Sequence, residues 1–162
     1  MSRLQKMFTR LLKRKADRNE PYAMKLLRSY AAPLRVLFVD DNHRLRELLV
    51  GMGERDFIME TTGAATLAEA RALIREHEFD AVLLDQMLGD GEGIELYREI
   101  HDDRHHMRVV FFTGWASEEF RQRVESIGPA PVYSKNSMLK PGFLHQLLEE
   151  LGAPVLEPEL VH

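Results

Sequence analysis

Cysteine is absent from the 162 residues, which excludes disulfides and every metal site built from thiolates. This absence is compatible with a reducing compartment, and we expect the protein to be cytoplasmic. Long apolar runs are also missing, because no stretch approaches the roughly 20 residues that a membrane span needs. The N-terminus has neither the unbroken apolar stretch nor the small-residue cleavage site of a secretory signal. We therefore expect one domain with a hydrophobic core.

Charge is distributed unevenly along the chain. Residues 1–31 contain nine Lys and Arg against two acidic residues, whereas the rest of the chain contains thirteen against twenty-four. Within the basic part, apolar residues at positions 4, 7, 8, 11 and 12 recur at helical spacing. We predict three parts: a basic helical extension with a hinge (residues 1–33), a main domain (34–151) and a short C-terminal tail (152–162).

From residue 34 onward, short apolar runs alternate with segments of helical periodicity. Thr66 with Glu69 forms a capping box that predicts a helix start, and Gly51 with Gly53 predicts the end of another helix. We predict strands at 36–39, 57–61, 81–84, 109–112 and 131–133, and helices at 42–52, 66–77, 94–100, 117–128 and 141–152. Such alternation indicates an α/β fold, a doubly wound parallel sheet with helices on both faces.

Polar side chains stand at the carboxyl ends of the predicted strands, where ligands bind in open parallel sheets. Asp40 and Asp41 follow the first strand, Asp85 the third, Thr113 the fourth and Lys135 the fifth. Each is ordinary alone, because an Asp after a strand is often a helix N-cap and a Lys is usually solvated. Their joint placement at one edge of the sheet predicts a functional site.

The residue types of this set favour one kind of chemistry. Crowded carboxylates require a cation, and all-oxygen ligands suit Mg²⁺ or Mn²⁺. With the negative charge neutralised, an Asp carboxylate can attack a phosphoryl group and form an acyl phosphate. An ammonium and a hydroxyl group then bind the phosphoryl oxygens. The set therefore predicts a phosphoryl-transfer site.

Five short motifs occur in a fixed order: Val-Asp-Asp at 39–41, Leu-Leu-Asp at 83–85, Asp-Gly-Glu-Gly at 90–93, Phe-Thr-Gly at 112–114, and Lys135. With these motifs, residues 34–151 resemble the receiver domains of bacterial two-component response regulators. The resemblance implies a flavodoxin-like five-stranded sheet of order 2-1-3-4-5 with five helices. It also implies a single-domain response regulator, a phosphoprotein rather than an enzyme, whose only chemistry is its own phosphorylation and dephosphorylation.

The resemblance assigns roles to individual residues. Asp85 would be the phosphoacceptor, and Thr113 and Lys135 would bind the phosphoryl group. The resemblance further implies four metal ligands, namely Asp40, Asp41, Asp85 and the backbone carbonyl of Met87. Lys140 precedes Pro141 and imitates the Lys-Pro pair of the family, but Lys135 has the better spacing from Thr113. The phosphodonor would be a histidine kinase or a phosphotransfer protein.

Several positions depart from the family pattern. Gly89 stands where many members have proline, which predicts a looser loop. The aromatic switch position is Val132, whereas Tyr133 should point to the opposite face of the sheet. Met87 and Trp115 are large apolar residues two places after Asp85 and Thr113. We hypothesise that they obstruct the hydrolytic water and prolong the life of the phosphoaspartate.

Other interpretations remain open. The chain could instead be a receiver-like interaction module that works through its basic N-terminal helix without phosphorylation. A homodimer is a further option, and residues 1–31 could contact a downstream protein target, an anionic membrane surface or nucleic acid. The histidines at 101, 105 and 106, with Asp102 and Asp103 among them, are interpreted as a solvated helix terminus rather than a metal site.

Overall fold

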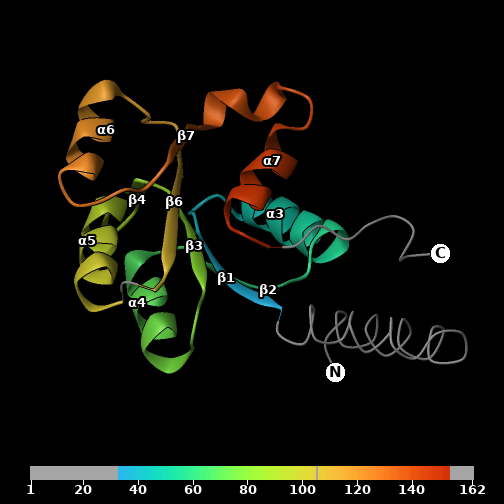
Figure 1. Ribbon diagram of the computed structural model, residues 1–162, viewed down its shortest axis with the longest axis horizontal. Helices are drawn as coiled ribbons and strands as arrows, with labels where there is room; N and C mark the ends of the chain where they lie inside the picture. Colours follow the sequence, from blue (N-terminus) through green and yellow to red (C-terminus); the bar gives the residue numbers. More distant parts are fainter. Residues whose placement is uncertain (1–32, 105, 154–162) are drawn as a thin grey trace, which may run out of the picture.

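The computed structural model describes residues 33–104 and 106–153. The predicted N-terminal helix and hinge, apart from Pro33, and the tail beyond Ala153 lie outside these residues. Five parallel strands form the sheet: β1 (Leu34–Val39), β2 (Met59–Ala64), β3 (Ala81–Leu84), β6 (Arg108–Thr113) and β7 (Val132–Ser134). Their order is β2-β1-β3-β6-β7, which is the predicted order 2-1-3-4-5 (Figure 1).

Five α-helices connect and follow the strands, as predicted: α3 (His43–Asp56), α4 (Leu67–Glu76), α5 (Gly93–Asp103), α6 (Glu118–Glu125) and α7 (Phe143–Glu150). Helices α4, α5 and α6 cover one face of the sheet, and α3 and α7 cover the other (Figure 1). None of the helices in the described part of the chain has the length and apolar character that a bilayer crossing requires.

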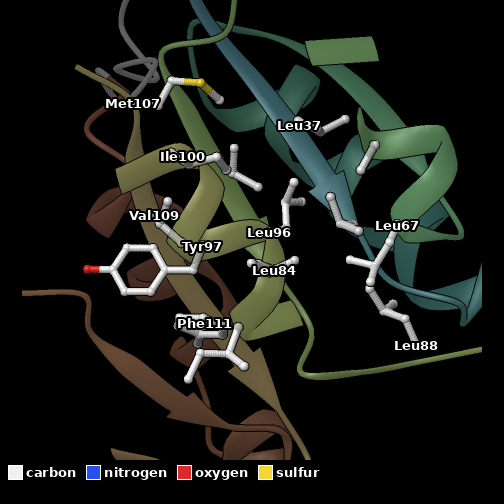
Figure 2. Close-up of a cluster of buried hydrophobic side chains, with 14 of the residues drawn as sticks. Leu37, Leu67, Leu84, Leu88, Leu96, Tyr97, Ile100, Met107, Val109 and Phe111 are labelled. Carbon is white, nitrogen blue, oxygen red and sulfur yellow. The ribbon is translucent and has the colours of Figure 1, made fainter. Parts of the chain in front are cut away.

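Alternation along the strands divides the core into two clusters. Leu37, Leu84 and Phe111 belong to the cluster beneath α4, α5 and α6, together with Leu96 and Ile100 of α5 (Figure 2). The neighbouring residues along the same strands face α3 and α7 instead. The buried stretches of the central strands, namely residues 36–39, 81–84 and 109–112, are apolar throughout because both of their faces are covered, and polar side chains follow at their carboxyl ends. This arrangement places the functional groups at the edge of the sheet.

Several predicted boundaries differ from the structure, and the second strand spans Met59–Ala64 rather than 57–61. Helix α3 continues through Gly51 and Gly53 to Asp56. A Cβ on Gly53 would lie 2.6 Å from the sulfur of Met59, so this glycine permits close packing of the helix on β2 rather than ending the helix. The last helix starts at Phe143, and a short 3-10 helix, η1 (Lys135–Leu139), precedes it. Sequence periodicity gave no indication of η1.

The loop after β3 also contains structure that the sequence analysis did not predict. Met87–Leu88 (β4) and Gly91–Glu92 (β5) form a small antiparallel ladder. Asp90, in the turn of this ladder, accepts hydrogen bonds from the backbone amides of Leu67 and Ala68 at the start of α4. The loop that Gly89 was expected to loosen is therefore tied to a neighbouring helix.

Candidate phosphoryl-transfer site

Asp40 and Asp85 lie next to each other because their strands are adjacent in the sheet. The Asp85 amide donates to the Val39 carbonyl at 2.9 Å, which fixes the two strand ends in register. Both aspartates are almost completely buried, with 4% and 5% of their surface exposed. Burial of two carboxylates side by side is costly unless a positive charge accompanies them.

Lys135 supplies such a charge. It follows the last residue of β7, and its ammonium lies 2.7 Å from Asp40 Oδ2 and 2.8 Å from Asp85 Oδ2. Lys140, the alternative suggested by the Lys-Pro pair, is exposed beyond η1. Of the two candidate lysines, Lys135 is therefore the one that contacts both buried aspartates.

Asp41 completes a group of three carboxylates. One oxygen from each of Asp40, Asp41 and Asp85 lies within 4.8 Å of the others. On one octahedral Mg²⁺ at 2.0–2.1 Å, neighbouring oxygens are about 2.9 Å apart and opposite ones about 4.2 Å, so binding would draw the three carboxylate oxygens closer together. Asp41 is exposed and can move freely. The donor set thus fits a hard divalent cation, and such an acidic cluster is typical of a receiver metal site.

The electrostatics of the group also favour an added cation. Burial raises the pKa of Asp40, against the opposing effects of hydrogen bonds from Lys135 and from the Asn42 amide. Burial by itself would lower the pKa of Lys135, but hydrogen bonds to Asp40 and Asp85 outweigh it and raise this pKa. One ammonium facing three carboxylates leaves negative charge uncompensated, and a bound cation would relieve it.

Thr113 is the last residue of β6 and is fully buried. Its hydroxyl oxygen accepts a hydrogen bond from the Trp115 amide at 3.1 Å. Trp115 and Met87 are 63% and 45% exposed, so neither is ordinary core packing. Met87 begins β4 and Trp115 stands in the loop after β6, and both segments leave the edge of the sheet where Asp85 and Thr113 lie.

Gln86, which the sequence analysis overlooked, supports the loop after Asp85. It is buried, and its side-chain oxygen accepts the Ile94 amide of α5 at 2.9 Å. Gly93 donates its amide to the Gln86 carbonyl, and a Cβ on Gly93 would lie 2.1 Å from the Asp85 carbonyl oxygen. Only glycine allows this approach. No local pattern in the sequence indicates that Gln86, two residues after β3, is buried against the start of α5.

Asp40 has two further supports on α3 that were also overlooked. Its Oδ1 accepts the Asn42 amide at 2.9 Å, and its carbonyl accepts a hydrogen bond from the Arg46 guanidinium. Asn42 is at the same time the N-cap of α3, where its side chain accepts the Leu45 amide. The capping preference of Asn indicated the helix start, but no local pattern indicates the role of Arg46.

The switch position differs from the family pattern as the sequence predicted. Val132 is buried in the cluster beneath α4, α5 and α6, whereas Tyr133 packs in the opposite cluster near Phe143. An aromatic ring at position 133 is therefore separated from Phe111 and α6 by the sheet. Arg121 of α6 instead donates to the Val132 carbonyl at 2.6 Å.

Comparison with known protein families matches residues 36–148 to the response regulator receiver domain. The chain belongs to this family. Receiver domains are phosphoacceptor modules of two-component signalling rather than enzymes, and membership implies a cognate histidine kinase as a partner.

Individual relatives agree with this assignment of the receiver domain. This chain is 33% identical over 87 residues to the DNA-binding transcriptional activator DevR/DosR of Mycobacterium tuberculosis. The match spans 53% of this chain and 40% of that protein. The chain is 29% identical over 127 residues to the polar-differentiation response regulator DivK of Brucella anthropi, spanning 74% of this chain and 98% of DivK.

The same fold occurs in solved structures. A CheY-like receiver domain protein from Methanospirillum hungatei JF-1 superposes with a TM-score of 0.60 at 28% sequence identity, covering 75% of this chain and 92% of that one.

DevR/DosR is longer than the matched region, so this chain spans about two fifths of its length.

Proposed function

We propose that this receiver domain accepts a phosphoryl group on Asp85 from a histidine kinase or a phosphotransfer protein, in the cytoplasm and with Mg²⁺ or Mn²⁺ bound. The contact of the Lys135 ammonium with both Asp85 and Asp40 is the observation that supports this most strongly. A buried carboxylate paired with a lysine beside two further acids is what an aspartyl phosphate site requires.

In the proposed reaction a carboxylate oxygen of Asp85 attacks phosphorus while the bond from phosphorus to the donor histidine nitrogen breaks. Asp40, Asp41, Asp85 and the Met87 carbonyl would hold the metal, which neutralises charge in the transition state. Lys135 and the Thr113 hydroxyl would bind the phosphoryl oxygens. Thr113 would then move toward the phosphoryl group. This movement would pull on the hydrogen bond that the Trp115 amide donates to the Thr113 hydroxyl oxygen.

The phosphorylated domain would signal by protein–protein contact. The buried Val132 rules out a bulky aromatic switch at that position, so the change at Thr113 must reach the surface by another route. The rival function is a receiver-like interaction module that works through its basic N-terminal residues 1–31 without phosphorylation. It predicts a site that does not respond to phosphoryl analogues.

Trp115 offers a direct test because it is the single tryptophan of the chain and follows Thr113 closely. Beryllofluoride with Mg²⁺ should change its fluorescence in the wild type and leave Asp85→Asn unchanged. Lys140→Ala serves as a matched control and should respond like the wild type. A wild type as silent as Asp85→Asn would favour the interaction module.

A further inference from the structure

A hollow lies at the opposite end of the sheet from Asp85. It has a volume of about 490 Å³ and opens between the C-terminal end of α5, the start of β6 and the connection from α6 to β7. This volume is within the range of about 300–1,000 Å³ that small-molecule sites occupy. Ten residues line it: Tyr97, Ile100, His101, Arg104, His106, Met107, Arg108, Val109, Pro129 and Pro131.

The floor of the hollow is apolar and well ordered by packing. Ile100, Met107 and Val109 are core residues, each less than 10% exposed. Tyr97 packs edge-on against Phe111, and its hydroxyl points away from the cluster (Figure 2). Pro129 and Pro131 stiffen the opposite wall. A flat apolar group would find a preformed surface here.

The rim of the hollow is cationic, against the overall charge of the domain. Residues 33–153 contain 22 Asp and Glu against 13 Lys and Arg. Yet Arg104 and Arg108, with His101 and His106, line the hollow, and no acidic side chain is among its described lining residues. The histidines interpreted as a solvated helix terminus are in part the wall of this cavity, although His105 lies outside the described residues.

Acidic residues outside the hollow neutralise this rim only weakly. Glu150 is 3.8 Å from Arg108, Glu78 is 4.0 Å from His106 and Asp102 is 3.6 Å from His101. All three distances exceed hydrogen-bond length, and the exposed ion pair between Arg108 and Glu150 contributes little. The guanidinium group of Arg108 thus keeps the capacity to bind an incoming anion bidentately, and Arg104, which also lines the hollow, adds a second guanidinium group.

We propose that this hollow binds a small molecule with one anionic head, a carboxylate or a phosphate, on a flat apolar body. The head meets Arg104 and Arg108, and the body lies on Tyr97 and Val109. The site is separate from Asp85, and its occupation does not depend on phosphorylation.

The test uses the full chain, labelled with ¹⁵N, and salicylate and phenyl phosphate as the two probes. Each should give saturable shifts of backbone amides at Tyr97, His101 and Val109, and the tighter probe identifies the preferred head. Benzyl alcohol, which lacks the charge, should bind at least tenfold more weakly. The variant Asp85→Asn should bind both probes like the wild type, which keeps this proposal independent of the proposed function.

The double variant Arg104→Gln/Arg108→Gln should weaken both probes at least tenfold while its spectrum elsewhere stays that of the folded protein. Arg44→Gln, which removes an exposed charge on α3, should leave the affinities unchanged. The proposal fails if neither probe gives saturable shifts at the hollow. Equal binding of benzyl alcohol, or unaltered affinity in the double variant, would overturn it as well.

Discussion

Replacing Asp40 by asparagine should stabilise the metal-free protein, although it removes a residue of the site. The carboxylate is almost fully buried, and burial raises its pKa despite the contact with Lys135. A carboxyl group whose pKa is higher in the folded than in the unfolded state destabilises the fold once it is ionised in both states. Asparagine keeps the shape, but its single side-chain oxygen can replace only one of the two acceptors, Oδ2 for the Lys135 ammonium or Oδ1 for the Asn42 amide, and the loss of the other hydrogen bond reduces the gain.

The magnitude follows from the distances in the site. Two unit charges 4.8 Å apart, the limit for these carboxylate oxygens, repel each other by about 3.5 kcal/mol at an effective dielectric constant of about 20. The attraction between Asp40 and Lys135 offsets much of this repulsion. The raised pKa shows that the balance, including desolvation, disfavours the charge. We expect a gain on the order of 1 kcal/mol in the free energy of unfolding at pH 7.

Urea unfolding in the presence of a chelator measures this gain. The sign of the pH dependence is fixed by the raised pKa: the cost of Asp40 is absent below the unfolded value near pH 4 and appears as the pH rises through the folded value. The gain should therefore be present at pH 7 and vanish near pH 4. Added Mg²⁺ should stabilise the wild type more than Asp40→Asn. The difference between their free energies of unfolding should therefore shrink or change sign.

Asp80 provides a control of opposite sign. Its pKa is lowered, chiefly by hydrogen bonds from the Arg35 side chain, so its contribution is present above the unfolded pKa and is lost as the pH falls through the folded one. Asp80→Asn should cost at most about 1 kcal/mol at pH 7, because the pair is partly exposed, and little at pH 3. A loss of stability in Asp40→Asn at pH 7 without metal would refute the reasoning about the buried carboxylates.

Three further predictions concern the site and its support. Gly93→Ala should lower the free energy of unfolding in urea by about 3 kcal/mol, because its Cβ would overlap the Asp85 carbonyl. Gly51→Ala, which has open space around it, should raise this free energy by about 0.5–1 kcal/mol. Equal effects would contradict the packing argument. Replacing Met87 and Trp115 together by serine should speed hydrolysis of the phosphoaspartate about threefold to tenfold, as measured by the release of phosphate. An unchanged rate would reject the hypothesis that these two side chains obstruct the hydrolytic water. Lys135→Ala should abolish the shift that beryllofluoride causes in the NMR signal of an α6 backbone amide, whereas Lys140→Ala should retain this shift. The same result in both variants would favour neither lysine.

The parts of the fold that local patterns determine could be predicted from the sequence. Apolar runs identified β1, β3 and β6, and the Thr66 cap identified the start of α4. Because parallel strands end at one edge, the sequence also predicted that Asp40, Asp85 and Lys135 would meet there, and the structure brings them within hydrogen-bond distance.

Features that depend on contacts between distant residues could not be predicted in this way. Gly53 reads locally as a helix breaker, but its close contact with Met59 keeps it inside α3. Asp90 and Gln86 act on amides that are 23 and 8 residues away in the chain. Periodicity and turn preferences report only on near neighbours in sequence, so these hydrogen bonds were visible only in the folded structure.

The most direct test of the central proposal is the mass of the intact protein after incubation with acetyl phosphate and Mg²⁺. We predict the addition of one phosphoryl group, lost on treatment with hydroxylamine, which cleaves acyl phosphates, and located at Asp85 by peptide mapping. Asp85→Asn should gain no mass, and omission of the metal should prevent the reaction. A wild type that stays unmodified, or a phosphoryl group that persists in Asp85→Asn, would contradict the assignment of Asp85 as the phosphoacceptor.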